Sequence, residues 1–221
     1  MQFGIVTWAT PGDRFRAGLP DGELVVVSAD TVADAAPVPG ARVVAVGELL
    51  ARAAAVNRGV VALGADVDWV LVADPRAELC PGAVEALSAA AARFPRAGVL
   101  GPRLRGPDGS VRPSAGALPT ARDLRRGRVP FGAPRHTAPV GWVAGECLLV
   151  RRAAWESVDG FDARHLGPVD AVDLGARLVR AGWLVVHVPA AEVVVGAGPA
   201  TGMLEAVDRG LRRYAKGFRH A

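Results

Sequence analysis

Short runs of valine, isoleucine and leucine, each bounded by turn residues, recur through the first half of this 221-residue chain. Runs of this length and apolarity are typical of strands that are buried on both faces of a sheet. We expect such strands at Phe3–Thr7, Glu23–Val27, Arg42–Val46, Trp69–Val72 and Gly98–Leu100. They favour a sheet that is covered on both sides.

Helical periodicity separates several of these runs. Apolar residues that step by three or four predict a helix around residues 49–60 and another after Pro81, at residues 84–91. A later helix is expected over Val169–Arg180, ending near Gly182. Strands that alternate with helices predict an α/β fold with a mainly parallel central sheet and helices on both faces.

The remaining pattern is less regular. It predicts a hairpin turn at Pro107–Gly109, a strand at Val143–Val150, and a last strand at Trp183–Val188 that Pro189 ends. Residues 113–140 lack periodicity and hold several Pro, Gly and Arg residues, so we expect a mobile loop, either functional or simply disordered.

Composition narrows the class of protein. A content of 51% hydrophobic and 22% charged residues suits a soluble globular domain. No run approaches the roughly 18 apolar residues of a membrane span, and the first residues read as a strand, so a cytoplasmic location is expected. Cys80 and Cys147 stand far apart without a Cys-x-x-Cys partner, which indicates neither a disulfide framework nor a zinc site.

Arginine supplies almost all of the positive charge, and the net charge is +4. One cluster falls in the irregular segment and another at the C-terminus: Arg122, Arg125, Arg126, Arg128 and Arg135, then Arg209, Arg212, Arg213, Lys216 and Arg219. Such clusters attract phosphates or an anionic membrane surface, or are simply solvated. The sequence holds no nucleic-acid-binding motif and few aromatic residues for base stacking, so no nucleic-acid partner is expected.

Ligands of open α/β sheets bind beyond the carboxyl ends of the strands. Polar residues follow three of the predicted strands: Ser28-Ala-Asp30, Ala73-Asp-Pro-Arg76 and Glu192–Gly196. Carboxylates at such places are suited to hold Mg²⁺ or Mn²⁺, or to take a proton from a substrate hydroxyl.

Several segments occur in an order that resembles a known family. They are Asp68–Arg76, Pro107–Ser110, Gly141–Arg152, Gly160–Asp162 and Val172–Leu178. This order resembles the family 2 glycosyltransferases, and among them the rhamnosyltransferases that act on polyprenyl-diphosphate-linked sugars in bacterial cell-wall assembly.

The resemblance implies one GT-A-like domain over residues 1–221. Within it we expect a nucleotide-binding half at 1–112, the mobile loop at 113–140, an acceptor half at 141–196 and a basic C-terminal helix at 197–221. The implied activity is inverting transfer from a nucleotide sugar, such as dTDP-rhamnose, to a lipid-linked or glycan acceptor. The inner membrane face, reached by peripheral contact with anionic lipid, is then an alternative to a free cytoplasmic location.

The resemblance also assigns nucleotide-binding residues. Asp74 and Arg76 stand where the family carries Asn/Asp-x-Asp, so Arg76 takes the place of the metal-binding carboxylate. Ser28 stands where an aspartate grips the base or ribose, with Asp30 as a substitute two residues on. Asn57 lies in a matching segment. A divalent metal is expected in the family, but no metal ligand is assigned here because an arginine opposes the ion it replaces.

The catalytic and pocket residues complete the assignment. The family's acidic pair reads Asp170-Ala171, so alanine occupies the base position and Asp170 and Asp173 are the remaining candidates; either could instead cap the helix. Trp142 and Gly145 are expected to line the donor and acceptor cavity, and His165 to lie in the acceptor loop. Two functions stay open: a glycosyltransferase, and a silent module of the same fold that binds a sugar, a nucleotide or a partner protein.

Overall fold

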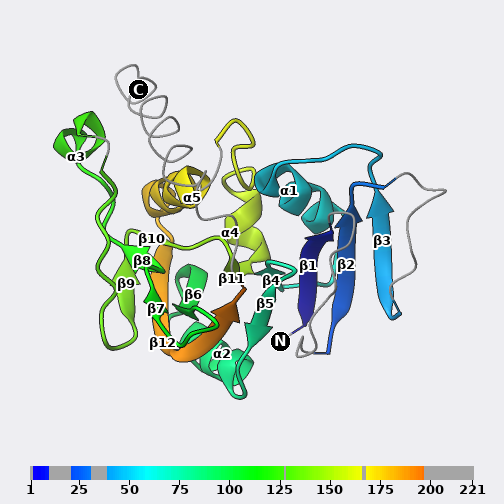
Figure 1. The fold of residues 1–221 in the computed structure, drawn as a ribbon, viewed down its shortest axis with the longest axis horizontal. Helices are drawn as coiled ribbons and strands as arrows, with labels where there is room; N and C mark the ends of the chain where they lie inside the picture. Colours follow the sequence, from blue (N-terminus) through cyan, green and yellow to red (C-terminus); the bar gives the residue numbers. More distant parts are fainter. Residues whose placement is uncertain (1, 10–20, 31–38, 127, 166–167, 197–221) are drawn as a thin grey trace.

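The described part of the chain is built around one large twisted sheet (Figure 1). A computed structural model describes residues 2–9, 21–30, 39–126, 128–165 and 168–196. The basic helix expected over residues 197–221 lies outside these ranges.

The sheet has ten strands, eight of which lie along one path in the order β3-β2-β1-β4-β11-β6-β12-β5. Its first half consists of β1 (Phe3–Ala9), β2 (Glu23–Ser28), β3 (Ala41–Ala45) and β4 (Trp69–Ala73). Its second half consists of β5 (Ala77–Leu79), β6 (Ala97–Arg105), β11 (Cys147–Arg151) and β12 (Leu184–Val195). Two short strands are added at the sides, with β7 (Val111–Arg112) on β6 and β9 (Ala138–Val140) on β12.

Most strands of the path run in the same direction. The pairs β1–β2, β1–β4, β2–β3 and β6–β12 are parallel, while β11 is antiparallel to both of its neighbours. A single reversed strand between β4 and β6 leaves those two strands parallel to each other. The predicted mainly parallel sheet is therefore confirmed.

Helices cover both faces, as predicted. Helix α2 (Ala83–Arg93) packs through Leu87 on a core that includes Ile5 and Leu71. On the other face, α1 (Arg52–Ala62), α4 (Arg152–Glu156) and α5 (Pro168–Arg180) contribute to a second core that includes Val6 and Val72. Neighbouring strand residues enter opposite cores because side chains alternate across a strand.

The last strand is longer than predicted. Strand β12 continues through Pro189 to Val195, with its register against β6 shifting between Val188 and Glu192. A proline has no N–H to donate to the neighbouring strand. The register shift lets the strand continue past Pro189 without that hydrogen bond. The prediction that Pro189 ends the strand was wrong.

Two other predicted segments are subdivided. The strand expected at Val143–Val150 is two strands, β10 (Trp142–Val143), which pairs with β8 (Ala115–Gly116), and β11 on the main sheet. The irregular segment 113–140 contains β8, β9 and the short helix α3 (Ala121–Arg125), so it is not without secondary structure. The turn at Pro107–Gly109 is confirmed, because Gly109 has a φ of +79° and β6 and β7 pair across it.

Candidate functional site

Several strand ends meet at one edge of the sheet. Strands β1, β2 and β4 end there, and β11 begins there because it runs antiparallel to β4, with Cys147 opposite Ala73. The end of β12 reaches the same place, since the Gly196 amide donates to the Arg76 carbonyl at 3.2 Å. This is the edge at which the sequence predicted the site.

Asp74 and Arg76 bind each other at the end of β4. The Arg76 guanidinium donates from Nε to Oδ1 and from Nη2 to Oδ2 of Asp74, both at 2.9 Å. The Arg76 amide also donates to Oδ1 at 2.9 Å. Both carboxylate oxygens thus face a cation, and this pair does not fit the ligand set of a divalent ion.

A second arginine, which the sequence analysis missed, lies at the centre of the edge. Arg52, the first residue of α1, contacts the Asp170 carboxylate in the first turn of α5 and donates from Nε to Oδ2 at 3.3 Å. Its Nη1 lies 3.8 Å from Oε2 of Glu146. Burial alone would lower the pKa of Arg52, but Asp170 and Glu146 raise it above its usual value, so the cation is permanent.

The position of Arg52 explains the glycine at 145. A Cβ placed on Gly145 would lie 2.7 Å from Cζ of Arg52, so a side chain there would displace the guanidinium. On its other side Arg52 lies 6.0 Å from the centroid of the Phe161 ring. Gly145 therefore serves to admit Arg52 to the site.

Trp142 is part of the core beside this edge. It is 1% exposed, its indole Nε1 donates to the Pro130 carbonyl at 3.3 Å, and its ring meets Phe131 edge-on at 5.5 Å. The structure gives it a packing role that anchors residues 130–131. Its contribution to a donor or acceptor cavity stays a prediction.

Asn57 fastens α1 to the loop before α5. Its Nδ2 donates to the Phe161 carbonyl at 2.8 Å, and its Oδ1 accepts from the Phe161 amide at 3.0 Å. An amide side chain that bonds both the N–H and the C=O of one residue holds the backbone of that residue in place. The structural role is clear, whereas nucleotide binding by Asn57 stays a prediction.

Asp173 is paired with Arg177 rather than with Arg52, and it lies next to His165. Its Oδ2 accepts from Nε of Arg177 at 2.7 Å, and its Oδ1 is 4.0 Å from Nε2 of His165. Asp162 is 3.6 Å from the same nitrogen. Asp162, His165 and Asp173 together could hold a metal ion, although Arg164 and Arg177 already pair with the two carboxylates.

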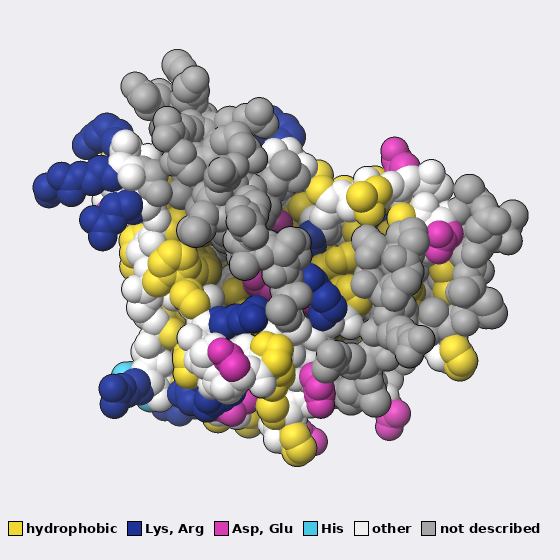
Figure 2. Space-filling view, in the orientation of Figure 1, with side chains coloured by type: hydrophobic (Ala, Val, Ile, Leu, Met, Phe, Trp, Pro, Cys, Tyr) yellow, Lys and Arg dark blue, Asp and Glu magenta, His cyan; other side chains and the backbone are white. Residues whose placement is uncertain are grey.

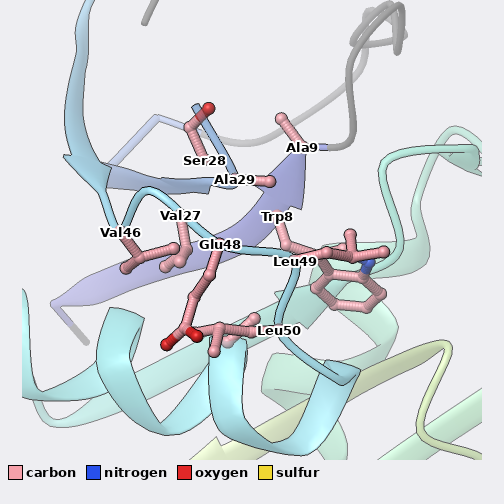
Figure 3. Close-up of a pocket in the computed structure, with 10 residues that line it drawn as sticks. Trp8, Ala9, Val27, Ser28, Ala29, Val46, Glu48, Leu49 and Leu50 are labelled. Carbon is pink, nitrogen blue, oxygen red and sulfur yellow. The ribbon is translucent and has the colours of Figure 1, made fainter. Parts of the chain in front are cut away.

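A pocket opens at the ends of β1, β2 and β3 (Figure 3). It has about 220 Å³ of space, part of it open to solvent, and its lining includes Trp8, Ser28, Glu48 and Leu49. The Ser28 hydroxyl donates to Asp30 Oδ2 at 2.9 Å, so these two predicted residues are in contact. Space for water-sized molecules within it amounts to only about 10 Å³, far below the roughly 300–1,000 Å³ of ligand pockets, so these residues line a shallow hollow at the strand ends.

Sequence reasoning missed three residues of this edge. Arg52 is followed directly by the apolar residues 53–56, and Glu146 is the one charged residue in the run Gly141–Val150. Trp8 is the residue that directly follows the first predicted strand, which was expected to end at Thr7. A charge inside an apolar run was the available signal for the first two, because such a charge needs a partner when buried.

Known proteins share this architecture. The family model described as "Glycosyltransferase like family 2" matches residues 23–217. Solved structures of similar fold include GalNAc-T7 with UDP, GalNAc and Mn²⁺ (TM-score 0.63, 12% identity, 89% of this chain and 44% of that chain). The S. aureus TarS 1-349 complex with UDP-GlcNAc is also similar (TM-score 0.60, 10% identity, 93% of this chain and 61% of that chain).

Two curated relatives are closer in sequence. They are N-acetylglucosaminyl-diphospho-decaprenol L-rhamnosyltransferases of Mycobacterium tuberculosis strains CDC 1551 and H37Rv, each 44% identical over 191 residues. The match covers 74% of this chain and 61% of theirs. In the described residues no helix is long and apolar enough to cross a membrane. With the sheet, the strand-edge residues and the family model in agreement, the chain belongs to glycosyltransferase family 2.

Proposed function

We propose that this protein transfers a sugar, with inversion, from a nucleoside-diphosphate donor to a lipid-linked acceptor. The observation that carries the proposal is the shared sheet edge, where the pocket of Trp8 and Ser28 and the charges of Asp74, Arg76 and Arg52 lie together. The pocket suits the nucleoside, and the two arginines suit the diphosphate.

The relatives support a finer assignment. The mycobacterial proteins are named as L-rhamnosyltransferases that act on N-acetylglucosaminyl-diphospho-decaprenol. We therefore propose a dTDP-rhamnose donor and a polyprenyl-diphosphate-linked sugar as acceptor. Both substrates carry diphosphates, which suits an edge that holds two arginines.

We further propose that donor binding does not depend on a divalent ion at the end of β4. There Arg76 occupies both oxygens of Asp74, so the chain supplies a fixed cation where a metal would need a carboxylate. Arg52 adds a second permanent charge. The role of these side chains is to bind and orient the leaving diphosphate and to oppose the charge that develops on it.

A transfer assay tests the activity. Purified protein is incubated with radiolabelled dTDP-rhamnose and a short-chain polyprenyl-diphosphate N-acetylglucosamine, with Mn²⁺ or with chelator. We expect labelled lipid product in both conditions. Product that forms only with Mn²⁺ would contradict the metal-independent part, and no product with this or other nucleotide sugars would contradict the activity.

A silent binding module is the second candidate. The observation that favours it is the position of the family's base, where Ala171 is 3% exposed and carries no ionisable group. A silent module would bind dTDP or a sugar without turnover. The assay above, run beside a binding titration, separates the two functions.

Peripheral contact with anionic lipid is a finer proposal about location. The segment around α3 carries five exposed arginines, Arg122, Arg125, Arg126, Arg128 and Arg135. Figure 2 shows basic side chains gathered over α3. Phe131 is 58% exposed in the same segment, and Asp123 is already engaged in the helix cap with Thr120.

Vesicle binding tests this location. Reversing Arg125 and Arg126 to glutamate should weaken binding to phosphatidylglycerol vesicles at least roughly tenfold, since each arginine near such a surface contributes about 1 kcal/mol. The matched control reverses Arg58 and Arg93, which are exposed on α1 and α2. Equal losses in the two double variants would show that only net charge matters.

A further inference from the structure

We propose that Glu146 is the general base that removes the proton from the acceptor hydroxyl. The proposal rests on the glycosyl transfer proposed above and names the residue that replaces the missing base. No resemblance assigns a role to this position.

The carboxylates of the edge differ in how far they are already engaged. Asp74 accepts from Arg76 on both oxygens. The Asp170 side chain is 1% exposed and contacts Arg52. The Asp173 side chain is 9% exposed and accepts from Arg177 at 2.7 Å. All three carboxylates are nearly buried and ion-paired, so an incoming hydroxyl has little access to them.

Glu146 is different. Its side chain is 26% exposed, and its nearest described cation is Nη1 of Arg52 at 3.8 Å. Within the described ranges of the chain, no hydrogen bond reaches its carboxylate. A general base needs an accessible lone pair within reach of the acceptor, and Glu146 meets this requirement at the site edge.

The backbone fixes Glu146 beside the donor charges. Its carbonyl accepts from the Asp74 amide at 2.7 Å, just before β11 begins. One guanidinium, that of Arg52, approaches both Glu146 and Asp170, the neighbour of Ala171. Glu146 therefore reaches the region in which the resemblance places the base.

The step balances without another reactant. The acceptor oxygen forms a bond to the anomeric carbon as its proton passes to the Glu146 carboxylate. The bond between the anomeric carbon and the phosphate oxygen breaks, and the nucleoside diphosphate leaves with the electron pair. Arg52 and Arg76 face the charge that this leaving group gains.

Glu146→Gln tests the proposal, because it keeps the shape and removes the base. We expect kcat for rhamnosyl transfer to fall by about 10²- to 10⁴-fold, while the dissociation constant for dTDP changes by less than roughly threefold. The control is Glu85→Gln, an exposed glutamate on α2 on the other face of the sheet. Formate should restore part of the kcat lost in Glu146→Ala, which a structural role would not allow.

The outcomes separate the inference from the proposed function. Turnover that persists in Glu146→Gln overturns the role of Glu146 and leaves the transferase. Loss of Mn²⁺-dependent dTDP binding in Glu146→Gln makes it a metal ligand and also overturns the role. A parent protein that binds dTDP but never transfers a sugar overturns both.

Discussion

The two parts of the site edge are built on different principles. Over β1, β2 and β3 the pocket is lined mainly by apolar side chains together with Trp8, and its polar members are Glu48 and Ser28, whose hydroxyl is bonded to Asp30. Between β4, β11 and α5 the edge consists of charges that already face one another. The first part offers shape and stacking, whereas a ligand entering the second part must compete with existing ion pairs.

This difference predicts how a nucleotide binds. The nucleoside end gains from contact with Trp8 and needs no rearrangement of charge. The diphosphate gains less, because Arg76 gives up bonds to Asp74 in order to bind it. We therefore expect weak binding in which the nucleoside contributes most.

The largest effect should come from the buried member of the charge network. Arg52→Met leaves the Asp170 carboxylate buried without its partner, and we expect the free energy of unfolding to fall by about 3–5 kcal/mol. Arg76→Met should cost less, about 1–3 kcal/mol, because Arg76 is 41% exposed and the buried Asp74 carboxylate keeps its hydrogen bond from the amide of residue 76. Urea unfolding of both variants measures this contrast, and equal losses would contradict the distinction between the two pairs.

The next largest effect is a gain of metal response. Arg76→Asp removes the cation from Asp74 and offers two neighbouring carboxylates, so Mn²⁺ should tighten dTDP binding about tenfold, or about 1.4 kcal/mol. Adding Ala171→Asp would also destabilise the fold, because Ala171 is buried and a carboxylate there would be desolvated. Calorimetry with and without Mn²⁺ checks the gain, with Arg76→Asn as the uncharged control. A folded Arg76→Asp that ignores Mn²⁺ would mean that the residue correspondence at β4 is wrong.

The smallest effect concerns a histidine on β12, outside both parts of the edge. Burial lowers the pKa of His187, which is 1% exposed and lies 3.4 Å from the Ser114 hydroxyl. The unfolded chain therefore binds a proton at a higher pH than the folded one does, and stability is lost as the pH falls below about 6.5. The loss is at most about 1.4 kcal/mol per pH unit. Unfolding of the parent and of His187→Gln at pH 7.5 and 5.5 measures this loss of stability. An equal loss in the two proteins would show that groups other than His187 cause it.

Local pattern was enough to predict the sheet but not the charge network. Runs such as Trp69–Val72 are apolar because the strand is buried on both faces, and this property is visible in the sequence. The path of β12 beyond Pro189 depends on a register shift against β6, which no local signal carries. Likewise Arg52 and Asp170 are 118 residues apart, and only the tertiary fold brings the start of α1 beside the first turn of α5.

Only the part of the candidate site that follows predicted strands could be inferred from local pattern. Asp74, Arg76 and Ser28 follow strands, so their place at the edge could be inferred from the strand ends. Glu146 precedes a strand, and it reaches the edge only because β11 is antiparallel to β4. The direction of that one strand was not predictable from its apolar run, and it determines which carboxylate joins the site.

Calorimetric titration of dTDP into the parent protein and into Trp8→Ala tests the central claim most directly, that the nucleoside pocket and the self-paired charges form one donor site. We expect weak binding by the parent that is unchanged by Mn²⁺ or chelator. Trp8→Ala should weaken it by about 1–3 kcal/mol, the usual contribution of stacking on an aromatic side chain. Tight binding that chelator abolishes, or equal affinity in the parent and Trp8→Ala, would contradict the account.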